Sequence, residues 1–225
     1  MTARPLDLGT WPRREHFRFF REYDNPYFNI CAEVDVTALL GRTRAPEGPS
    51  FFLSSLHRSL GAANDIEEFR CRIRGDGVVV HDVIHGGSTI LRDDGTFAFG
   101  YFTYDPDFPR FAAGATEVLA AARASSGALE PRPERDDLLH YSVIPWVSFT
   151  SFSHARRRGT DDSVPKVVFG GHRRSGRRRK MPVSVEVHHA LMDGLHVGRF
   201  FERFQRRLDD PDELDLTPPD RSAPR

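Results

Sequence analysis

The strongest constraint on the fold lies in residues 181–208, where a strand pattern passes through a short turn into a helix pattern. Val183, Val185 and Val187 alternate with polar residues at a period of two, which predicts a strand. Residues suited to one helix face then recur at steps of three and four. They are Leu195, Gly198, Phe201, Phe204 and Leu208. Between the two patterns lies the string His-His-Ala-Leu-Met-Asp-Gly, so a strand end delivers polar side chains into a tight turn.

Helix and strand patterns mix irregularly along the rest of the chain. Helices are predicted over residues 14–23, 36–41, 50–63 and 111–125. Strands are predicted over residues 27–35, 69–74, 78–80, 88–91, 96–102, 139–144, 146–152 and 165–170. Because short turns join many of the strands, we expect an α/β two-layer sandwich with a mixed, largely antiparallel sheet and packed helices. Residues 1–210 are predicted to form one domain, and residues 211–225 a frayed polar tail.

Composition excludes several classes of function. The formal net charge of the 225 residues is zero, so nothing indicates a nucleic-acid partner. No apolar run approaches the roughly 20 residues of a membrane span, and the first residues lack the apolar stretch of a signal peptide. Cys31 and Cys71 are too few for a disulfide framework or a cysteine metal site. We therefore expect a cytoplasmic protein with no membrane partner.

His189 is the first candidate for chemistry. A neutral imidazole with a pKa of about 6.5 can accept a proton from a hydroxyl group near neutral pH. Asp193 could fix the turn or the imidazole, and Gly194 would let the backbone leave the strand end tightly. A plainer interpretation makes both histidines polar residues at a strand end. A metal site is not expected, because His188 and His189 point to opposite faces of a strand.

The His-His-x-x-x-Asp-Gly string followed by Leu-His-Val resembles the active-site signature of the chloramphenicol acetyltransferase family. The wider coenzyme-A-dependent acyltransferase superfamily shares the core of this string. Further blocks in the same order extend the resemblance over most of the chain. They are the Trp-x-Arg-x-Glu-x-Phe pattern of residues 11–17, residues 68–70, Phe97, and residues 142–152. The resemblance implies acetyl-CoA as a co-substrate, with no permanently bound cofactor.

The resemblance also implies roles for individual residues. His189 would be the general base that takes the proton of an acceptor hydroxyl, whose oxygen would attack the acetyl thioester directly. Ser142 would donate a hydrogen bond to the developing oxyanion, a contact typically worth ~2.7–4 kcal/mol of barrier. Arg13 would hold Asp193 in an ion pair that supports the turn. Without the resemblance, Ser142 is a plain strand serine and Arg13 a surface charge.

A homotrimer with each active site between two subunits is implied as well. Trp146 would lie along the acetyl-CoA tunnel, although a core aromatic residue is an equal interpretation. Val168 stands near the co-substrate, where the family commonly has a threonine. Phe20, Phe97 and His154 would contact the acceptor.

Some residues depart from the family pattern near the acceptor pocket. Phe20 replaces a frequent tyrosine, and residues 153–158 (Ser-His-Ala-Arg-Arg-Arg) replace an apolar stretch. Polar and cationic side chains suit a polar or anionic acceptor better than an apolar drug. Residues 173–180 would meet the phosphates of coenzyme A or form a solvated hairpin tip.

Three functions stay open. The first is a chloramphenicol O-acetyltransferase, an antibiotic-resistance activity. The second is the same chemistry on an endogenous polar or anionic hydroxyl acceptor. The third is a non-catalytic coenzyme A-binding or scaffold protein.

Overall fold

The computed structural model of the protein describes residues 3–46, 48–156 and 162–210. The helices are α1 (Arg14–Phe20), α2 (Thr37–Thr43), α3 (Phe51–Asn64), α4 (Phe108–Ala124) and α5 (Gly194–Asp209), with a 3₁₀ helix, η1, at Glu67–Arg70. The strands are β1 (Ala3–Pro5), β2 (Tyr27–Asp35), β3 (Cys71–Arg74), β4 (Gly77–His81), β5 (His85–Leu91), β6 (Phe97–Phe102), β7 (Leu138–Ile144), β8 (Lys166–Gly170), β9 (Arg173–Ser175) and β10 (Arg178–His188).

The main sheet has the strand order β2-β10-β8-β7-β5-β6, and β9 pairs with β10 beside it. The pairs β5–β7 and β7–β8 are parallel, whereas the other pairs in this sheet are antiparallel. A small antiparallel sheet has the order β1-β4-β3. This topology confirms the predicted α/β fold with a mixed, largely antiparallel sheet.

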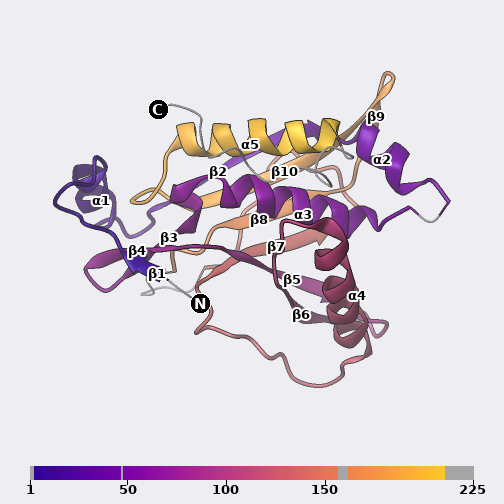
Figure 1. The fold of residues 1–225 in the computed structure, drawn as a ribbon, viewed down its shortest axis with the longest axis horizontal. Coiled ribbons are helices and arrows are strands. Elements are labelled where there is room, and N and C mark those ends of the chain that lie inside the picture. The colour runs from indigo at the N-terminus through magenta and orange to yellow at the C-terminus, as the bar shows by residue number, and fades with distance from the viewer. Residues whose placement is uncertain (1–2, 47, 157–161, 211–225) are drawn as a thin grey trace.

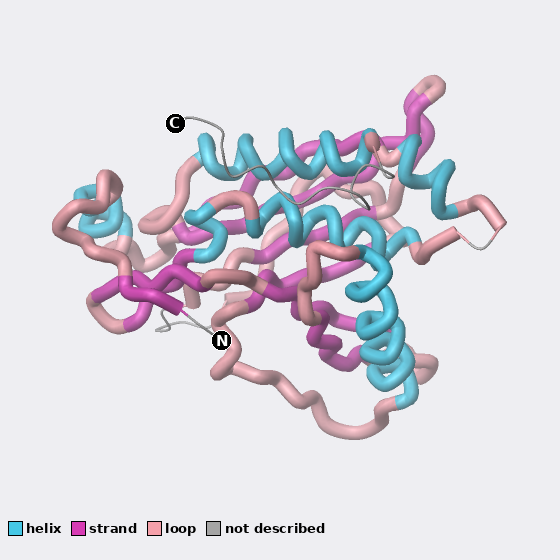
Figure 2. The backbone as a smooth tube through the Cα atoms, viewed as in Figure 1, coloured by secondary structure: helices cyan, strands magenta, loops and turns pink. Residues whose placement is uncertain are grey.

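Helices α3, α4 and α5 cover one face of the main sheet (Figure 1), and Figure 2 shows the same two layers by element type. Alternate side chains of each strand point into the space between the layers. Val183, Val185 and Val187 of β10 are fully buried there, as their alternation predicts. Phe169 of β8 stacks on Phe204 of α5 with ring centroids 5.9 Å apart. The apolar core therefore lies between this sheet face and the helices.

The opposite sheet face is covered in part by residues 145–156, which follow β7. The sequence predicts a strand over residues 146–152, and this prediction is wrong: no strand forms between Ile144 and the end of this segment at 156. The segment crosses the sheet instead of pairing with it. Phe149 packs so close to Gly170 that a Cβ atom there would lie 2.8 Å from the Phe149 ring. The segment is the reason that Glu186, on the polar side of β10, is nevertheless buried.

Two predicted helices have different bounds in the structure. The first helix ends at Phe20 instead of residue 23. Helix α4 begins at Phe108, before the predicted start, because Asp107 caps it and Pro109 occupies its first turn, where backbone N–H groups need no helical partner. Pro109 therefore lies in the first turn of a helix and does not interrupt it.

The buried stripe of α5 agrees with the predicted stripe at Phe204 and Leu208 and differs from it nearer the start of the helix. It consists of His196, Val197, Phe200, Phe204 and Leu208. The predicted member Leu195 is 58% exposed instead. A buried polar residue, His196, takes part in the stripe, so a pattern of apolar residues alone misassigns the first turns of the helix.

Three further expectations concern the C-terminal tail, the two cysteines and membrane-spanning helices. The predicted polar tail, residues 211–225, lies outside the described residues. Cys31 and Cys71 are both free thiols. Within the described ranges, the structure has no helix with the length and apolar character of a membrane span.

Candidate active site

The candidate active site begins where β10 ends. His188 is the last residue of β10 and Gly194 is the first of α5, so residues 189–193 form the predicted turn between strand and helix. The backbone N–H of His189 donates to the Pro26 carbonyl at 2.7 Å. This hydrogen bond ties the turn to the chain just before the neighbouring strand β2.

Two phenylalanine rings hold the His189 imidazole. Phe20 of α1 stacks on it with ring centroids 3.8 Å apart and an interplanar angle of 10°. Phe28 of β2 contacts it at 4.7 Å and 52°. The imidazole is half-buried between them. Because aromatic contact on two sides restricts side-chain rotation, the ring has a defined orientation.

The backbone selects the tautomer of His189. Its Nδ1 atom lies 3.0 Å from the carbonyl oxygen of Met192. A carbonyl oxygen only accepts hydrogen bonds, so Nδ1 carries the proton. In the neutral ring Nε2 then has the free lone pair, which is the atom that can accept a proton from a substrate.

Arg13 and Asp193 form an ion pair beside this turn. Arg13 Nη1 donates to Asp193 Oδ2 at 2.5 Å, and Arg13 Nε donates to the Leu191 carbonyl at 3.1 Å. Asp193 also caps α5 by accepting from the Leu195 N–H at 3.0 Å. Burial raises the pKa of Asp193, but the hydrogen bond from Arg13 and the neighbouring His196 outweigh it, and the pKa lies below its usual value. The aspartate therefore stays charged at neutral pH and fastens the turn to α1.

His188 and Gly194 flank the turn. His188 is buried, with Nδ1 accepting from the Ala190 N–H at 3.2 Å and the ring edge on Tyr27 at 5.1 Å. Gly194 has no positive φ, and a Cβ added to it would meet no atom within 4 Å. The turn therefore does not depend on the conformational freedom of glycine at this position.

Ser142 lies far from His189 in the same chain. In the sheet register Ser142 is opposite Val168, and Val168 is opposite Ser184. His189 is five residues after Ser184, which is about 16 Å along the strand direction, and two strand spacings of about 4.8 Å add to this. Two groups about 19 Å apart cannot act on one reacting group. The structure therefore does not bring these two residues together within one chain.

The residues expected near the co-substrate (Trp146 and Val168) and one expected near the acceptor (Phe97) differ in exposure. Trp146 is 71% exposed, which excludes a core aromatic role in the isolated chain. Phe97, on the outermost strand β6, is 40% exposed. Val168, by contrast, is fully buried between Ser142 and Ser184. In this conformation Val168 can only shape the surroundings of Ser142.

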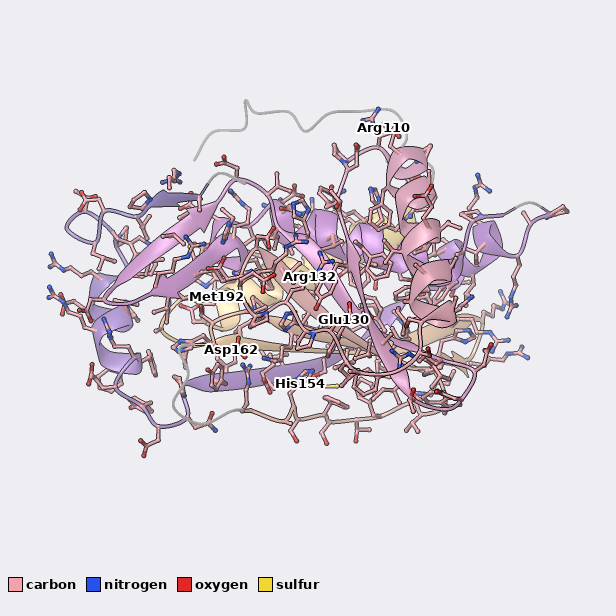
Figure 3. All side chains as sticks on the ribbon, turned by 90° about the horizontal axis from the view of Figure 1, so that it is seen from below. Arg110, Glu130, Arg132, His154, Asp162 and Met192 are labelled. Carbon is pink, nitrogen blue, oxygen red and sulfur yellow. The ribbon has the colours of Figure 1, made fainter. Side chains whose placement is uncertain are left out.

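A compact charge cluster occupies the sheet face that the helices leave open. Arg156 donates from Nε to Glu186 at 2.8 Å and from Nη1 to Asp162 at 3.0 Å. Lys166 donates to the same Asp162 at 2.6 Å, and His154 Nδ1 lies 3.6 Å from Glu186. Figure 3 shows His154 and Asp162 on the side of the sheet away from α4. Because two carboxylates face the two cations, Arg156 has no unpaired positive charge for an anionic acceptor.

The sequence alone does not indicate what His196 contacts, whereas the structure places it in the cap of α5. His196 is buried, accepts from the Asp193 N–H through Nδ1 at 3.1 Å, and lies 3.3 Å from Glu68 through Nε2. It occupies the third helical position of a capping box, where Glu or Gln is usual. A histidine at that position, three residues after the aspartate, is the signal that could have identified it.

The basic hairpin of residues 173–180 is partly neutralised. Arg173 pairs with Glu33 at 2.9 Å, and Lys180 lies 3.5 Å from Asp35. The preceding residue, His172, has a buried Nδ1 atom with no hydrogen-bond partner among the described residues. His172 lies in the loop that is tied to the Trp146 turn by the hydrogen bond from the Gly171 N–H to the Val147 carbonyl, at 2.8 Å. The sequence does not indicate this histidine.

The sequence matches a known protein family over most of its length. Residues 1–205 match the sequence family described as chloramphenicol acetyltransferase. The protein is therefore an acyltransferase. More particularly, the chain belongs to the chloramphenicol acetyltransferase family.

Individual relatives agree over nearly the whole chain. A chloramphenicol acetyltransferase of Streptomyces acrimycini is 34% identical over 212 residues, covering 93% of this chain and 96% of that protein. Chloramphenicol acetyltransferase 3 of Escherichia coli is 28% identical over 206 residues, covering 91% and 96%.

Solved structures agree as well. One of a chloramphenicol acetyltransferase is 30% identical with a TM-score of 0.82, covering 92% of this chain and 100% of that one. A dihydrolipoamide acetyltransferase of Azotobacter vinelandii, 15% identical with a TM-score of 0.66 over 90% of this chain and 88% of that one, shares the fold.

Proposed function

We propose that the protein is an acetyl-CoA-dependent O-acetyltransferase in which His189 is the general base. The observation that carries this proposal is the hydrogen bond from His189 Nδ1 to the Met192 carbonyl, which leaves Nε2 free to take a proton. Nε2 removes the proton of an acceptor hydroxyl as its oxygen attacks the thioester carbonyl. The tetrahedral intermediate then collapses to the acetyl ester, and coenzyme A leaves as the thiol.

Ser142 stabilises the oxyanion of this intermediate, and it comes from a second copy of the chain. The separation of about 19 Å between Ser142 and His189 within one chain supports this arrangement. Phe19, 59% exposed, and Tyr23 lie on the surface close to His189, on α1 and just after it. Another exposed apolar group lies at the far end of the sheet. It consists of Leu91, Phe97, Trp146 and Val147.

Contact between these two different surfaces is a head-to-tail contact, which gives a ring when the rotation between copies closes and an open filament when it does not. We propose that the ring is a homotrimer, as the family resemblance implies. Trp146 then lies on the side from which acetyl-CoA reaches Ser142, while Phe20, Phe97 and His154 border the acceptor.

The first acceptor to test is chloramphenicol, which the names of the relatives indicate. A second candidate is another polar hydroxyl compound, because a half-buried His154 beside Glu186 replaces apolar surface. The balanced charge cluster favours a neutral polar acceptor over an anionic one. A set of alcohols assayed with acetyl-CoA distinguishes the candidates.

The test of the mechanism is thiol release from acetyl-CoA with chloramphenicol and with the alcohol set. The His189→Ala variant should lose roughly 10²–10⁴-fold in rate, the range for general base catalysis. Ser142→Ala should lose on the order of 10²-fold. Ser151→Ala, an exposed serine in the following segment, is the matched control and should retain the rate. A His189→Ala variant with the full rate would disprove the mechanism.

Mixing two inactive variants tests the shared site. When His189→Ala and Ser142→Ala chains are unfolded together and refolded, about a quarter of the sites in random rings combine both intact residues. Activity should therefore reappear in the mixture. No recovery, with each variant assembled normally, would place both residues of a site in one chain. Tight coenzyme A binding in calorimetry without transfer to any alcohol would instead favour a non-catalytic role.

A further inference from the structure

One peptide group of the turn lies between two imidazoles. The carbonyl of the Met192–Asp193 peptide accepts from His189 Nδ1 at 3.0 Å. The N–H of the same peptide points at His196 Nδ1, 3.1 Å away. The other nitrogen of His196, Nε2, lies 3.3 Å from Glu68 Oε1. A continuous chain of polar contacts thus runs from η1 through α5 and the turn to the proposed base. Met192 is labelled in Figure 3.

The geometry determines the direction of these hydrogen bonds. Because the Asp193 N–H is a donor, His196 Nδ1 accepts from it, and in the neutral tautomer that makes this bond the ring proton is on Nε2. The Asp193 carboxylate oxygen Oδ1 also lies 3.0 Å from Nδ1, beside the backbone N–H that donates to it. Nε2 then donates to Glu68. Burial raises the pKa of Glu68, yet the hydrogen bond from His196 lowers it below its usual value overall, which keeps this carboxylate ready to accept. Each ring thus has one neutral tautomer that matches its hydrogen bond to the Met192–Asp193 peptide.

We infer that His196, held by Glu68, is a positioning residue that fixes the tautomer and orientation of His189 through the Met192–Asp193 peptide. This inference rests on the proposed function of His189 as base. If the peptide rotated, its carbonyl would leave His189, and the proton of that ring could move to Nε2. His189 would then present a donor where the acceptor hydroxyl needs a base.

The turn has further restraints, but they act on other atoms. Arg13 holds the Leu191 carbonyl and the Asp193 side chain. Neither contact involves the Met192–Asp193 peptide group. An ordinary capping box would need only an acceptor at the third helical position, whereas His196 also reaches Glu68 on a different element. The additional contact fixes which nitrogen of His196 faces the peptide.

The experiment compares two substitutions of His196. His196→Gln keeps an acceptor that can reach the Asp193 N–H, as glutamine does in capping boxes. His196→Leu removes it. In imidazole ¹⁵N NMR, wild type and His196→Gln should show protonated Nδ1 in His189, and His196→Leu should show a tautomer mixture. The leucine variant should lose on the order of 10-fold in kcat with little change in KM for acetyl-CoA, whereas the glutamine variant should stay within about 3-fold of wild type.

Glu68 provides a second pair of variants. Glu68→Gln keeps an acceptor for Nε2 of His196 and should retain kcat and the His189 tautomer. Glu68→Leu frees His196 to exchange tautomers and should show a smaller loss than His196→Leu. Phe204→Leu is the control for stability, because it weakens α5 away from the turn and should retain kcat. Stability is compared for all variants by urea unfolding.

The inference is overturned if His196→Leu and Glu68→Leu keep the His189 tautomer and the wild-type kcat. It is also overturned if Phe204→Leu lowers kcat as much at equal loss of stability. Absence of acetyl transfer by the wild type would instead contradict the proposed function. The NMR spectra still decide the inference in that case, because they need no substrate.

Discussion

The two faces of the main sheet contrast in what they bury. On the face covered by helices, alternate strand residues are apolar and pack against α3, α4 and α5. On the opposite face, buried ions and paired polar groups lie beneath the 145–156 segment, and Trp146 and Val147 at its start are exposed. Burial of apolar surface stabilises the first face without any partner. Under the proposed function a second chain completes the other face, where the proposed catalytic residues of two chains come together.

The largest effect should come from a cavity on the helix face. Phe200 is fully buried and stacks on Phe69 with centroids 5.2 Å apart. Phe200→Ala should lower the free energy of unfolding by about 3–5 kcal/mol. Phe97→Ala on the open face should cost less than about 1 kcal/mol in dilute chains, yet weaken assembly in sedimentation measurements. Equal losses of stability in urea unfolding would contradict the contrast between the faces.

A pH effect of intermediate size should arise from His57, which lies between α3 and α4. Burial among aromatic rings lowers the pKa of His57 to about 4, whereas an unfolded chain has about 6.5. The unfolded state therefore binds the proton first, and stability that is present above pH 6.5 is lost as the pH falls towards 4. The loss approaches roughly 3 kcal/mol, at 1.36 kcal/mol per pH unit.

The check is the difference in unfolding free energy between wild type and His57→Phe, measured from pH 7 to pH 4.5. This difference removes the shared contribution of carboxyl groups. A difference that does not change with pH would contradict the assignment to His57.

A smaller effect should follow from breaking the charge cluster of the open face. Arg156→Met leaves Glu186 buried without its guanidinium partner, at a cost on the order of 2 kcal/mol, less than for fully buried pairs because Arg156 keeps some exposure. The double variant Arg156→Met with Glu186→Leu should recover much of this loss. Chemical unfolding of the single and double variants measures it, and a double variant weaker than both singles would show that the cluster stabilises as ions.

The smallest effect concerns Gly194. An alanine at the first position of α5 has room for its Cβ and needs no positive φ. Gly194→Ala should therefore raise the unfolding free energy by up to about 1 kcal/mol, because the unfolded chain loses freedom. A drop in thermal unfolding temperature would show that glycine is needed in the turn.

The same contrast between the faces explains how far the sequence could predict the structure. Strict alternation of Val183, Val185 and Val187 predicts the core side of β10, because that side faces only apolar neighbours. On the other side the segment 146–152 alternates like a strand, but it crosses the sheet, because Phe149 packs against Gly170 and the Gly171 N–H donates to the Val147 carbonyl. The periodicity of apolar residues predicts which side of a strand or helix is buried. It does not predict which other segment covers that side.

The candidate site shows the same limit. Motif spacing identifies His189 and Asp193, because both lie in one short turn. The role of His196 depends on which nitrogen faces Glu68, and no spacing rule specifies this. The separation of Ser142 from His189 follows from strand register, which pairs residues distant in sequence.

The register of Ser142 and Val168 has a consequence for regulation. Under the proposed mechanism a single folded chain carries two half-sites at opposite ends of one sheet, and neither half can turn over substrate. Catalytic activity then requires assembly of the chains. The rate per chain should fall steeply on dilution below the dissociation constant of the ring, while the fold of each chain persists. A newly synthesised chain would be inactive until it assembles with other copies.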